Sequence, residues 1–447
     1  MGRGFSRDIS NRQERASAPE VDSRVAAPAL WQNLFRILMS TRLNYRLIFI
    51  ALLLAGLAFE QIAREERPSI LGPGLHLRAY VANSADGTIS VVDLVGLSSI
   101  ATVPVGRAPS GLKPLPAQKE IWGVAGEPSE AGAGSTRRPQ EPGAGSSRNP
   151  QEPGAGSTWS PQEQGYVWVL RAAEGAIAAR IPVGPGPSAV EFSSDGRRAY
   201  VASAGANSVL VIDTAGKHVI ARARTGRHPG SPRLTPDGRT LLVPNRDDAT
   251  LELFDAVSLQ SLGAIPVAPH PDEIVVLPDS SVALLSSADA NQISAVDLRR
   301  RVLLTNIELG GTPSHLILKP DGGELYVTVP ESHGIEIINT WTMEIVDSMI
   351  VGLAPAAGTL NSAGNALYVS DSAADRLLPI DIFNSHLLAP IQVGRRPLVC
   401  RLDPSGELLL VADQDSNDLA VIRASTGSLL TMVPVGSRPS DLVVLLF

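Results

Sequence analysis

Charged and histidine side chains occupy equivalent positions in a Gly-x-x-Pro motif that repeats along most of this 447-residue chain. Counted from the proline, positions +2 and +4 carry acids, bases and one histidine: Lys113, Glu191, Arg233, Glu273, His315, Arg401 and Asp441. Such a set could bind a small polar or anionic ligand, or supply a general acid and base. It could equally form a structural lining in which opposite charges pair around water, because enclosed charges need partners.

The two variable positions of the motif hold a second basic set, which we expect around one rim of the fold: Arg107, Arg227, His228, His270, Arg395, Arg396 and Arg438. His228 and His270 lie 42 residues apart and so take the same place in adjacent repeats. Adjacent repeats would hold equivalent atoms about 10 Å apart, too far for both imidazoles to bind one ion. We therefore predict no metal site and a rim that favours acidic groups.

Other kinds of chemistry find little support. The chain has no Gly-x-Ser-x-Gly elbow, no His-Glu-x-x-His motif and no phosphate-binding glycine loop before a helix. The single cysteine, Cys400, excludes a disulfide framework and c-type haem attachment, and we interpret it as a small buried hydrophobe. The aspartates of 245–250 and 413–418 lack the spacing of a calcium loop and fit turn formation.

Composition excludes two further classes of function. A net charge of −7 with 19% charged residues argues against a nucleic-acid binder that works by bulk electrostatics. The five tryptophans do not recur with the repeat, which argues against the periodic tryptophan packing of quinone-binding propellers. We predict no cofactor.

The motif repeats with a period of 42 residues. From residue 184 onward its glycine position recurs at 184, 226, 268, 310, 352, 394 and 436. The interval from Gly106 to Gly184 is 78 residues, which accommodates one copy and a Gly/Pro/Ser-rich insert at 126–162. The insert contains three tandem 11-residue units whose composition cannot bury a core, so it predicts a flexible surface loop between a second and a third strand.

Each copy has the pattern of four short strands separated by tight turns. In the copy that follows Pro187 the expected strands are 188–193, 198–203, 208–213 and 219–226. Short strands without any helical period indicate an all-β fold, and four strands per repeat are typical of a β-propeller. Eight copies account for 75–447 and predict eight blades, with seven as the alternative. The final segment, 440–447, should supply the first strand of the first blade and so close the ring.

The run YVAN…ISVVDL…IATVPVGRAPSGL (80–112) resembles the YVTN-type β-propeller repeat of exported and surface-layer proteins of bacteria and archaea. The resemblance extends over 75–447 and implies a propeller fold and a prokaryotic source, although relatives are mostly seven-bladed. The family includes binding and surface proteins, and similar propellers occur in sugar-lactone hydrolases and quinoprotein subunits. The resemblance therefore leaves the function open.

An apolar segment precedes the repeats. The uncharged run at 47–59 is short for a membrane span, but flanking residues could extend it to a signal anchor or membrane helix at 47–63. Arginines concentrate before this segment, which predicts a disordered cytoplasmic tail at 1–46, a linker at 64–74 and a propeller outside the cytoplasm. The protein would be a single-pass membrane protein, or secreted or periplasmic if the segment is cleaved.

These features predict an exported or membrane-anchored propeller that acts as a binding scaffold. Its partner would be an unidentified protein or a small polar or anionic ligand, held in the channel or on the face that carries the rim and the insert. The alternative is a lactonase-like hydrolase with its site at the channel mouth, using Glu273, His315 and the rim arginines. A third possibility is a structural envelope protein without a ligand. No catalytic residue is assigned, and the scaffold is preferred to the enzyme.

Overall fold

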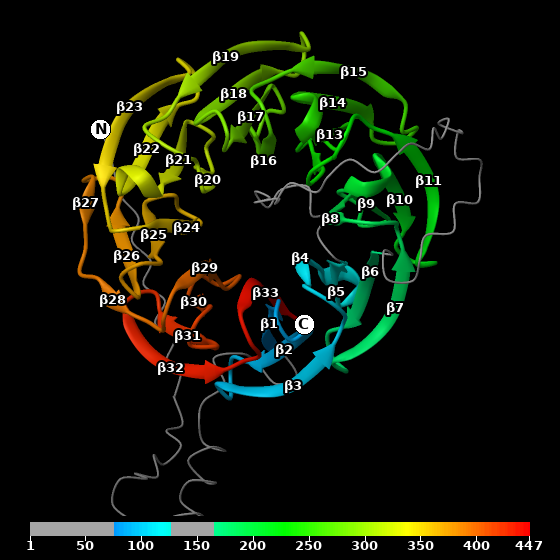
Figure 1. Cartoon of the computed structure of the whole chain (residues 1–447). Helices are drawn as coiled ribbons and strands as arrows, with labels where there is room; N and C mark the ends of the chain where they lie inside the picture. The colour runs from blue at the N-terminus through cyan, green and yellow to red at the C-terminus, as the bar shows by residue number, and fades with distance from the viewer. Residues whose placement is uncertain (1–75, 127–164) are drawn as a thin grey trace, which may run out of the picture. The chain divides into compact units, whose positions relative to one another are not determined.

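The computed structural model describes residues 76–126 and 165–447. The chain divides into two units, Met1–Pro68 and Ser69–Phe447, and every described residue belongs to the second. In that unit, eight antiparallel sheets follow one another around a ring (Figure 1). The predicted all-β propeller with eight blades is confirmed, and the alternative of seven blades is excluded.

In every blade the first strand lies nearest the ring axis and the fourth forms the outer wall (Figure 1). From blade 1 to blade 8 the first strands are β33 (Pro439–Leu446), β4 (Ser110–Leu115), β8 (Pro187–Phe192), β12 (Arg233–Leu234), β16 (Pro271–Val276), β20 (His315–Leu318), β24 (Pro355–Leu360) and β29 (Pro397–Leu402). The second strands are β1 (Leu77–Asn83), β5 (Glu120–Ala125), β9 (Arg198–Ser203), β13 (Thr240–Asn245), β17 (Val282–Ser287), β21 (Glu324–Val329), β25 (Ala366–Asp371) and β30 (Leu408–Asp413).

The outer half of each blade repeats the same order. The third strands are β2 (Thr88–Asp93), β6 (Tyr166–Arg171), β10 (Ser208–Asp213), β14 (Thr250–Asp255), β18 (Gln292–Asp297), β22 (Gly334–Asn339), β26 (Arg376–Asp381) and β31 (Asp418–Arg423). The fourth strands are β3 (Ser98–Pro104), β7 (Ala176–Pro182), β11 (His218–Arg224), β15 (Ser261–Pro266), β19 (Val302–Glu308), β23 (Glu344–Ile350), the pair β27 (His386–Leu387) and β28 (Ile391–Gln392), and β32 (Ser428–Pro434).

The up-and-down strand order gives the ring two different faces. The Gly-x-x-Pro connections and the second-to-third-strand loops share one side, which we call the loop face; in blade 3, for example, Gly205 N donates to Pro185 O at 3.1 Å. The first-to-second and third-to-fourth turns share the other side, which we call the turn face; in blade 6, Thr340 N donates to Gly323 O at 3.1 Å. Four 3₁₀ turns complete the described connections: η1 (Pro116–Gln118), η2 (Ala204–Ala206), η3 (Arg246–Asp248) and η4 (Pro330–Ser332).

The tight turns predicted between first and second strands form as expected, and one residue in each of these turns adopts a left-handed backbone. In the blade 3 turn the Asp195 carboxylate accepts the Arg197 amide at 3.0 Å, and Gly196 adopts a φ of +66°. Gly238 and Gly406 repeat this geometry with φ of +71° and +76°. A left-handed backbone is least strained for a residue without a Cβ, which favours glycine here, and in blade 5 Ser280 takes the same place with a φ of +59°.

The last strand closes the ring. β33 pairs antiparallel with β1, from Leu446 opposite Leu77 to Pro439 opposite Asn83. Beyond the strands, the backbones of His76 and Phe447 exchange hydrogen bonds of 2.8 and 3.0 Å. Blade 1 is therefore built from both ends of the repeat region, as the lone first-strand motif at 440–447 predicted.

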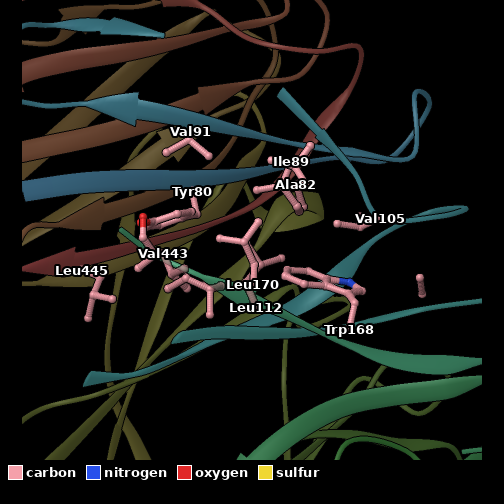
Figure 2. Packing of buried hydrophobic residues seen from close by; sticks show 14 residues of the cluster. Tyr80, Ala82, Ile89, Val91, Val105, Leu112, Trp168, Leu170, Val443 and Leu445 are labelled. Carbon is pink, nitrogen blue, oxygen red and sulfur yellow. The ribbon is translucent and has the colours of Figure 1, made fainter. Parts of the chain in front are cut away.

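The core lies between neighbouring blades, in eight clusters of buried side chains. Figure 2 shows the cluster shared by blades 1 and 2, where Tyr80, Trp168, Leu170 and Val443 pack together. The Tyr80 hydroxyl donates to Ala172 O at 2.9 Å, which satisfies its one polar atom in an apolar setting. Because each blade is buried only against its neighbours, closure is what completes the core.

Blade 7 departs from the pattern. Its fourth strand is split into β27 and β28, and Pro390, which cannot donate a ladder hydrogen bond, lies between the two parts. The insert connects β5 to β6, as predicted, but 127–162 and the segments 1–46, 47–63 and 64–74 lie outside the described residues. Within the described ranges, no helix has the length and apolar character needed to cross a bilayer.

Candidate functional site

A cavity of about 960 Å³ lies within the ring, and the first strands of all eight blades contribute to its wall. The predicted +2 and +4 residues are part of that wall: Lys113, Glu191, Arg233, Glu273, His315, Arg401 and Asp441. The alternating +3 residues, among them Val190, Ile274 and Leu316, also border the cavity, but their side chains are buried. The predicted register of the channel is therefore confirmed.

At position +2, three side chains connect their blade to the next. The Asp441 carboxylate of blade 1 accepts the Leu112 amide of blade 2 at 2.8 Å, and Glu273 of blade 5 accepts the Leu316 amide of blade 6 at 2.9 Å. His315 Nδ1 receives a longer bond of 3.5 Å from the Gly358 amide of blade 7. These side chains satisfy first-strand amides that have no ladder partner on the channel side.

Arginine at position +4 makes the complementary bond to a carbonyl. Arg233 Nε donates to Ile274 O, and Arg401 Nε donates to Leu442 O, each at 3.1 Å and each to the following blade. Anchoring through Nε positions the guanidinium while leaving its terminal nitrogens available to the cavity.

The remaining contacts between adjacent first strands are made by a salt bridge, by a second bond of Glu191 and by a thiol. Lys113 Nζ lies 2.6 Å from Glu191 Oε2 and joins blades 2 and 3, while Glu191 Oε1 accepts the Leu234 amide of blade 4 at 3.4 Å. Between blades 7 and 8 the Cys400 thiol reaches Ala357 O at 3.8 Å. Every pair of adjacent first strands is thus joined by a side-chain contact, an arrangement that the sequence did not reveal.

Cys400 is buried, as predicted, and burial raises the pKa of its thiol to about 12. It is a weak donor in a contact between adjacent first strands, and the inert thiol is unsuited to act as a nucleophile.

Glu273 and His315 face one another, with 3.7 Å between Glu273 Oε1 and His315 Nε2. Burial raises the pKa of Glu273 to about 7, against the opposing effect of the Leu316 amide. Burial and the positive charge of Arg401 lower the pKa of His315 to about 4. Burial thus disfavours the charged form of both groups, although the separation alone would suggest an ion pair.

Glu273 and His315 are partly exposed, but the surface that they expose faces the cavity. The side chains of His315 and Glu273 retain 28% and 30% of their surface, yet both belong to the cavity wall. A cavity walled by protein hydrates a charge less than open solvent does. Asp441 follows the same rule, because burial raises its pKa while Arg401 opposes the shift.

The rim residues behave differently from the prediction, because acids of the adjoining loops neutralise several of them. Arg227 Nε donates to Asp248 Oδ1 at 2.6 Å, His270 Nδ1 contacts Asp289 Oδ2, and Arg396 lies 3.9 Å from Asp415. Further contacts of the set are His228 to Asp247 at 3.8 Å and Arg395 to Asp415 O at 3.1 Å.

The basic rim is consequently weaker as an attractor of acidic groups than its composition indicated. None of the seven rim residues lines the cavity: Arg107, Arg227, His228, His270, Arg395, Arg396 and Arg438. The acids that pair with the rim residues come from the second-to-third-strand loops, which the sequence indicated only as turns. Each acid follows its basic partner by 19 to 21 positions. Within the described ranges no group of three metal-ligating side chains is present.

A second polar cluster lies beneath the blade 8 loop. Asp413, fully buried at the end of β30, is the register partner of Asp418 on β31. Asp413 Oδ2 accepts the Gly394 amide at 3.0 Å, while Oδ1 of each aspartate has no hydrogen-bond partner among the described residues. Burial, followed by the Asp418 carboxylate, raises the pKa of Asp413 to about 9. At neutral pH the two carboxyl groups therefore hold a proton.

Comparison with known proteins gives structural neighbours only. No protein-family model matches the chain, and no curated protein matches it. The dihydro-heme d1 dehydrogenase NirN, solved in complex with DHE, aligns with a TM-score of 0.63 and 14% identity over 82% of this chain and 74% of its own.

Two further structures align over less of the chain. A functionally unknown protein from Desulfotomaculum acetoxidans gives a TM-score of 0.50 and 16% identity over 63% of this chain and 95% of its own. Hydrazine synthase from Kuenenia stuttgartiensis gives 0.48 and 16% identity, over 58% and 95%. At these identities the likeness shows the propeller fold alone.

Proposed function

We propose that this protein is an exported or membrane-anchored propeller of the YVTN type whose central channel binds a small anionic ligand. The observation that carries the proposal is Arg401. It lines the cavity and is anchored through Nε, and no salt bridge among the described residues uses it. A fixed guanidinium with free terminal nitrogens suits bidentate binding of a carboxylate or phosphate.

The cavity and its other charges support the same ligand class. A volume of about 960 Å³ lies at the upper end of the usual range for small-molecule sites, about 300–1,000 Å³. The Lys113 and Glu191 charges compensate each other, and burial raises the pKa of Glu273 to about 7. Arg233 also lies 4.0 Å from Glu191 Oε2, so among the described residues Arg401 is the one Lys or Arg of the cavity wall without a salt bridge. The likeness to NirN, which was solved with a ligand, is compatible with a ligand-binding propeller but identifies no ligand for this chain.

A thermal-shift screen of the full chain in detergent tests the proposal, with succinate and inorganic phosphate as first probes. A ligand present at 100 times its Kd stabilises the folded state by about 2.7 kcal/mol, which raises the Tm by a few degrees. We expect a shift in the wild type that is lost in Arg401→Gln and kept in the control Arg227→Gln, whose arginine is already paired on the loop face. Equal shifts in all three proteins would place the ligand elsewhere.

A hydrolase site is the second candidate, supported by the pKa of about 7 for Glu273. A carboxylate near its pKa at neutral pH is suited to general-base catalysis. The rim arginines of the original hypothesis do not line this cavity, so Arg401 would have to stabilise the developing negative charge. Hydrolysis of sugar lactones that falls in Glu273→Gln, with ligand binding retained, would favour this function; no hydrolysis by the wild type would dismiss it.

A further inference from the structure

The third-to-fourth-strand turns place one residue of each blade at an equivalent tip of the turn face. In blade order these residues are Val95, Ala173, Ala215, Val257, Arg299, Trp341, Phe383 and Ser425. Four are large and apolar; Val95 is half-buried, whereas Val257, Trp341 and Phe383 are 72%, 81% and 88% exposed. A single exposed apolar residue is ordinary, but three at one structural position on one face form a surface feature. We call them the apolar tips.

Hydrogen bonds within each turn order the loop that carries the apolar tip. Val257 N donates to Asp255 Oδ1 at 3.1 Å, and Trp341 N donates to Asn339 Oδ1 at 2.9 Å. In the Phe383 turn, Asp381 Oδ1 accepts the Asn384 amide at 3.2 Å. Each turn is thus capped by its own first side chain, so exposure of the apolar residue is a property of an ordered turn.

The chain enters the ring on this same face. Leu94, in the third-to-fourth turn of blade 1, donates its amide to Leu77 O at 3.0 Å, at the start of β1. In the sequence the apolar segment 47–63 ends twelve residues before His76. Twelve residues extend at most about 40 Å. A membrane segment at 47–63 would therefore keep the start of β1, which lies on the turn face, within about 40 Å of the bilayer.

The arginines at the blade 5 tip have acidic partners. Blade 5 presents Arg299 between Val257 and Trp341, but Arg299 pairs with Asp279 at 3.5 Å. The adjacent Arg300 pairs with Asp297 at 3.8 Å. The arc between the tips is consequently suited to the interface of a bilayer, where tryptophan and phenylalanine partition, more than to a polyanion.

We propose that the turn face rests on the bilayer surface, with Val257, Trp341 and Phe383 inserted into the lipid interface. The tips belong to blades 4, 6 and 7 and the tether to blade 1, so the contacts are distributed around the ring and hold its axis upright on the membrane. The inference depends on the membrane anchoring proposed above. It adds an orientation and leaves the loop face exposed.

The test uses the full chain in phosphatidylcholine vesicles and a single environment-sensitive thiol label. Cys400 is 2% exposed and stays unlabelled in the folded protein. A label at Phe383→Cys should show a blue-shifted emission and protection from an aqueous quencher. The matched control, Arg395→Cys on the loop face, should show neither.

The outcomes separate this inference from the anchoring on which it depends. If the protein does not float with the vesicles, the anchoring fails. If it floats while the label at 383 stays in water, or if both labels enter lipid, the orientation is wrong. Shielding at 383 by added cell-envelope proteins and not by vesicles would identify a protein partner and overturn the lipid proposal.

A second readout applies if the cysteine variant does not fold. Brominated lipid should quench the fluorescence of the wild type more than that of Trp341→Phe, because the other described tryptophans, Trp122 and Trp168, are fully buried. Equal quenching in the two proteins would contradict insertion of Trp341.

Discussion

Replacing Asp413 by asparagine should make the protein less sensitive to alkaline pH. Asp413 is fully buried and faces Asp418, and its pKa rises from the ordinary 3.8 to about 9. Between these values the folded chain holds a proton that the unfolded chain releases, so stability falls as pH rises through this window. The slope is about 1.4 kcal/mol per pH unit, which amounts to about 4 kcal/mol between pH 5.5 and 8.5.

The fold itself indicates that asparagine is tolerated at this position. Asn83 in blade 1 and Asn245 in blade 4 occupy the equivalent end of the second strand and donate to Thr88 and Thr250 at 3.0 and 3.2 Å. An asparagine at 413 can likewise donate to Asp418, and it carries no proton to lose.

The assay is guanidinium unfolding of wild type and Asp413→Asn at pH 5.5, 7.0 and 8.5, followed by tryptophan fluorescence. The variant should gain stability relative to wild type as pH rises, by up to about 4 kcal/mol across the range. Comparing slopes removes any constant packing difference between the two side chains. A difference that is the same at pH 5.5 and 8.5 would refute the shared proton.

Blade 7 supplies the matched control. There Asp371 is equally buried but faces Arg376, with 3.1 Å between Asp371 Oδ2 and Arg376 Nη2. Asp371→Asn leaves that arginine without its partner and should destabilise the protein by roughly 2 kcal/mol, reduced from the fully buried case because Arg376 is partly exposed. Equivalent substitutions in adjacent blades are thus expected to act in opposite directions at alkaline pH.

Four further experiments test the fold, the rim and the burial of Cys400. Deleting 440–447 removes β33 and opens blade 1, which should lower the Tm sharply and expose the chain to limited proteolysis. Trp168→Ala should cost about 3–5 kcal/mol in chemical unfolding, because the ring is fully buried between blades 1 and 2. Arg227→Ala should leave the midpoint of chemical unfolding nearly unchanged, since its salt bridge with Asp248 is largely exposed. Cys400 should resist thiol reagents at pH 8 and react only in denaturant; rapid labelling of the native protein would contradict its burial.

The sequence predicted the blade architecture because one local pattern is repeated in constant register. The alternation of apolar and polar residues in each first strand was sufficient to separate the buried Ile274 from the channel-facing Glu273. Ring closure followed from an unpaired first-strand motif at 440–447. The split fourth strand of blade 7 was missed, although Pro390 is a visible signal that a ladder is interrupted.

The contacts of the channel residues could not be predicted in the same way. Repeat positions state which side chains face the axis, but the acceptor of Arg401 Nε, Leu442 O, belongs to the next blade. That contact depends on the rotation between blades, which no pattern within one repeat encodes. The pairing at the rim could have been predicted from the sequence. Asp248, which pairs with Arg227, lies in the 245–250 loop, but that loop was interpreted only as a turn.

The contacts between adjacent first strands also narrow the choice of channel residues that could bind a ligand. Asp441, Glu273 and Arg233 each use an atom to bind the following blade, so their presence in the channel is explained by the architecture whether or not a ligand enters. Arg401 makes such a contact as well, but it needs only Nε to do so. If the turn face lies on a bilayer, an anion reaches Arg401 from the loop face, past rim cations that already have acidic partners. Anion selection would then depend on one guanidinium inside the ring, and Asp248→Asn, which frees Arg227 at the rim, should add weak salt-sensitive binding without replacing the site lost in Arg401→Gln.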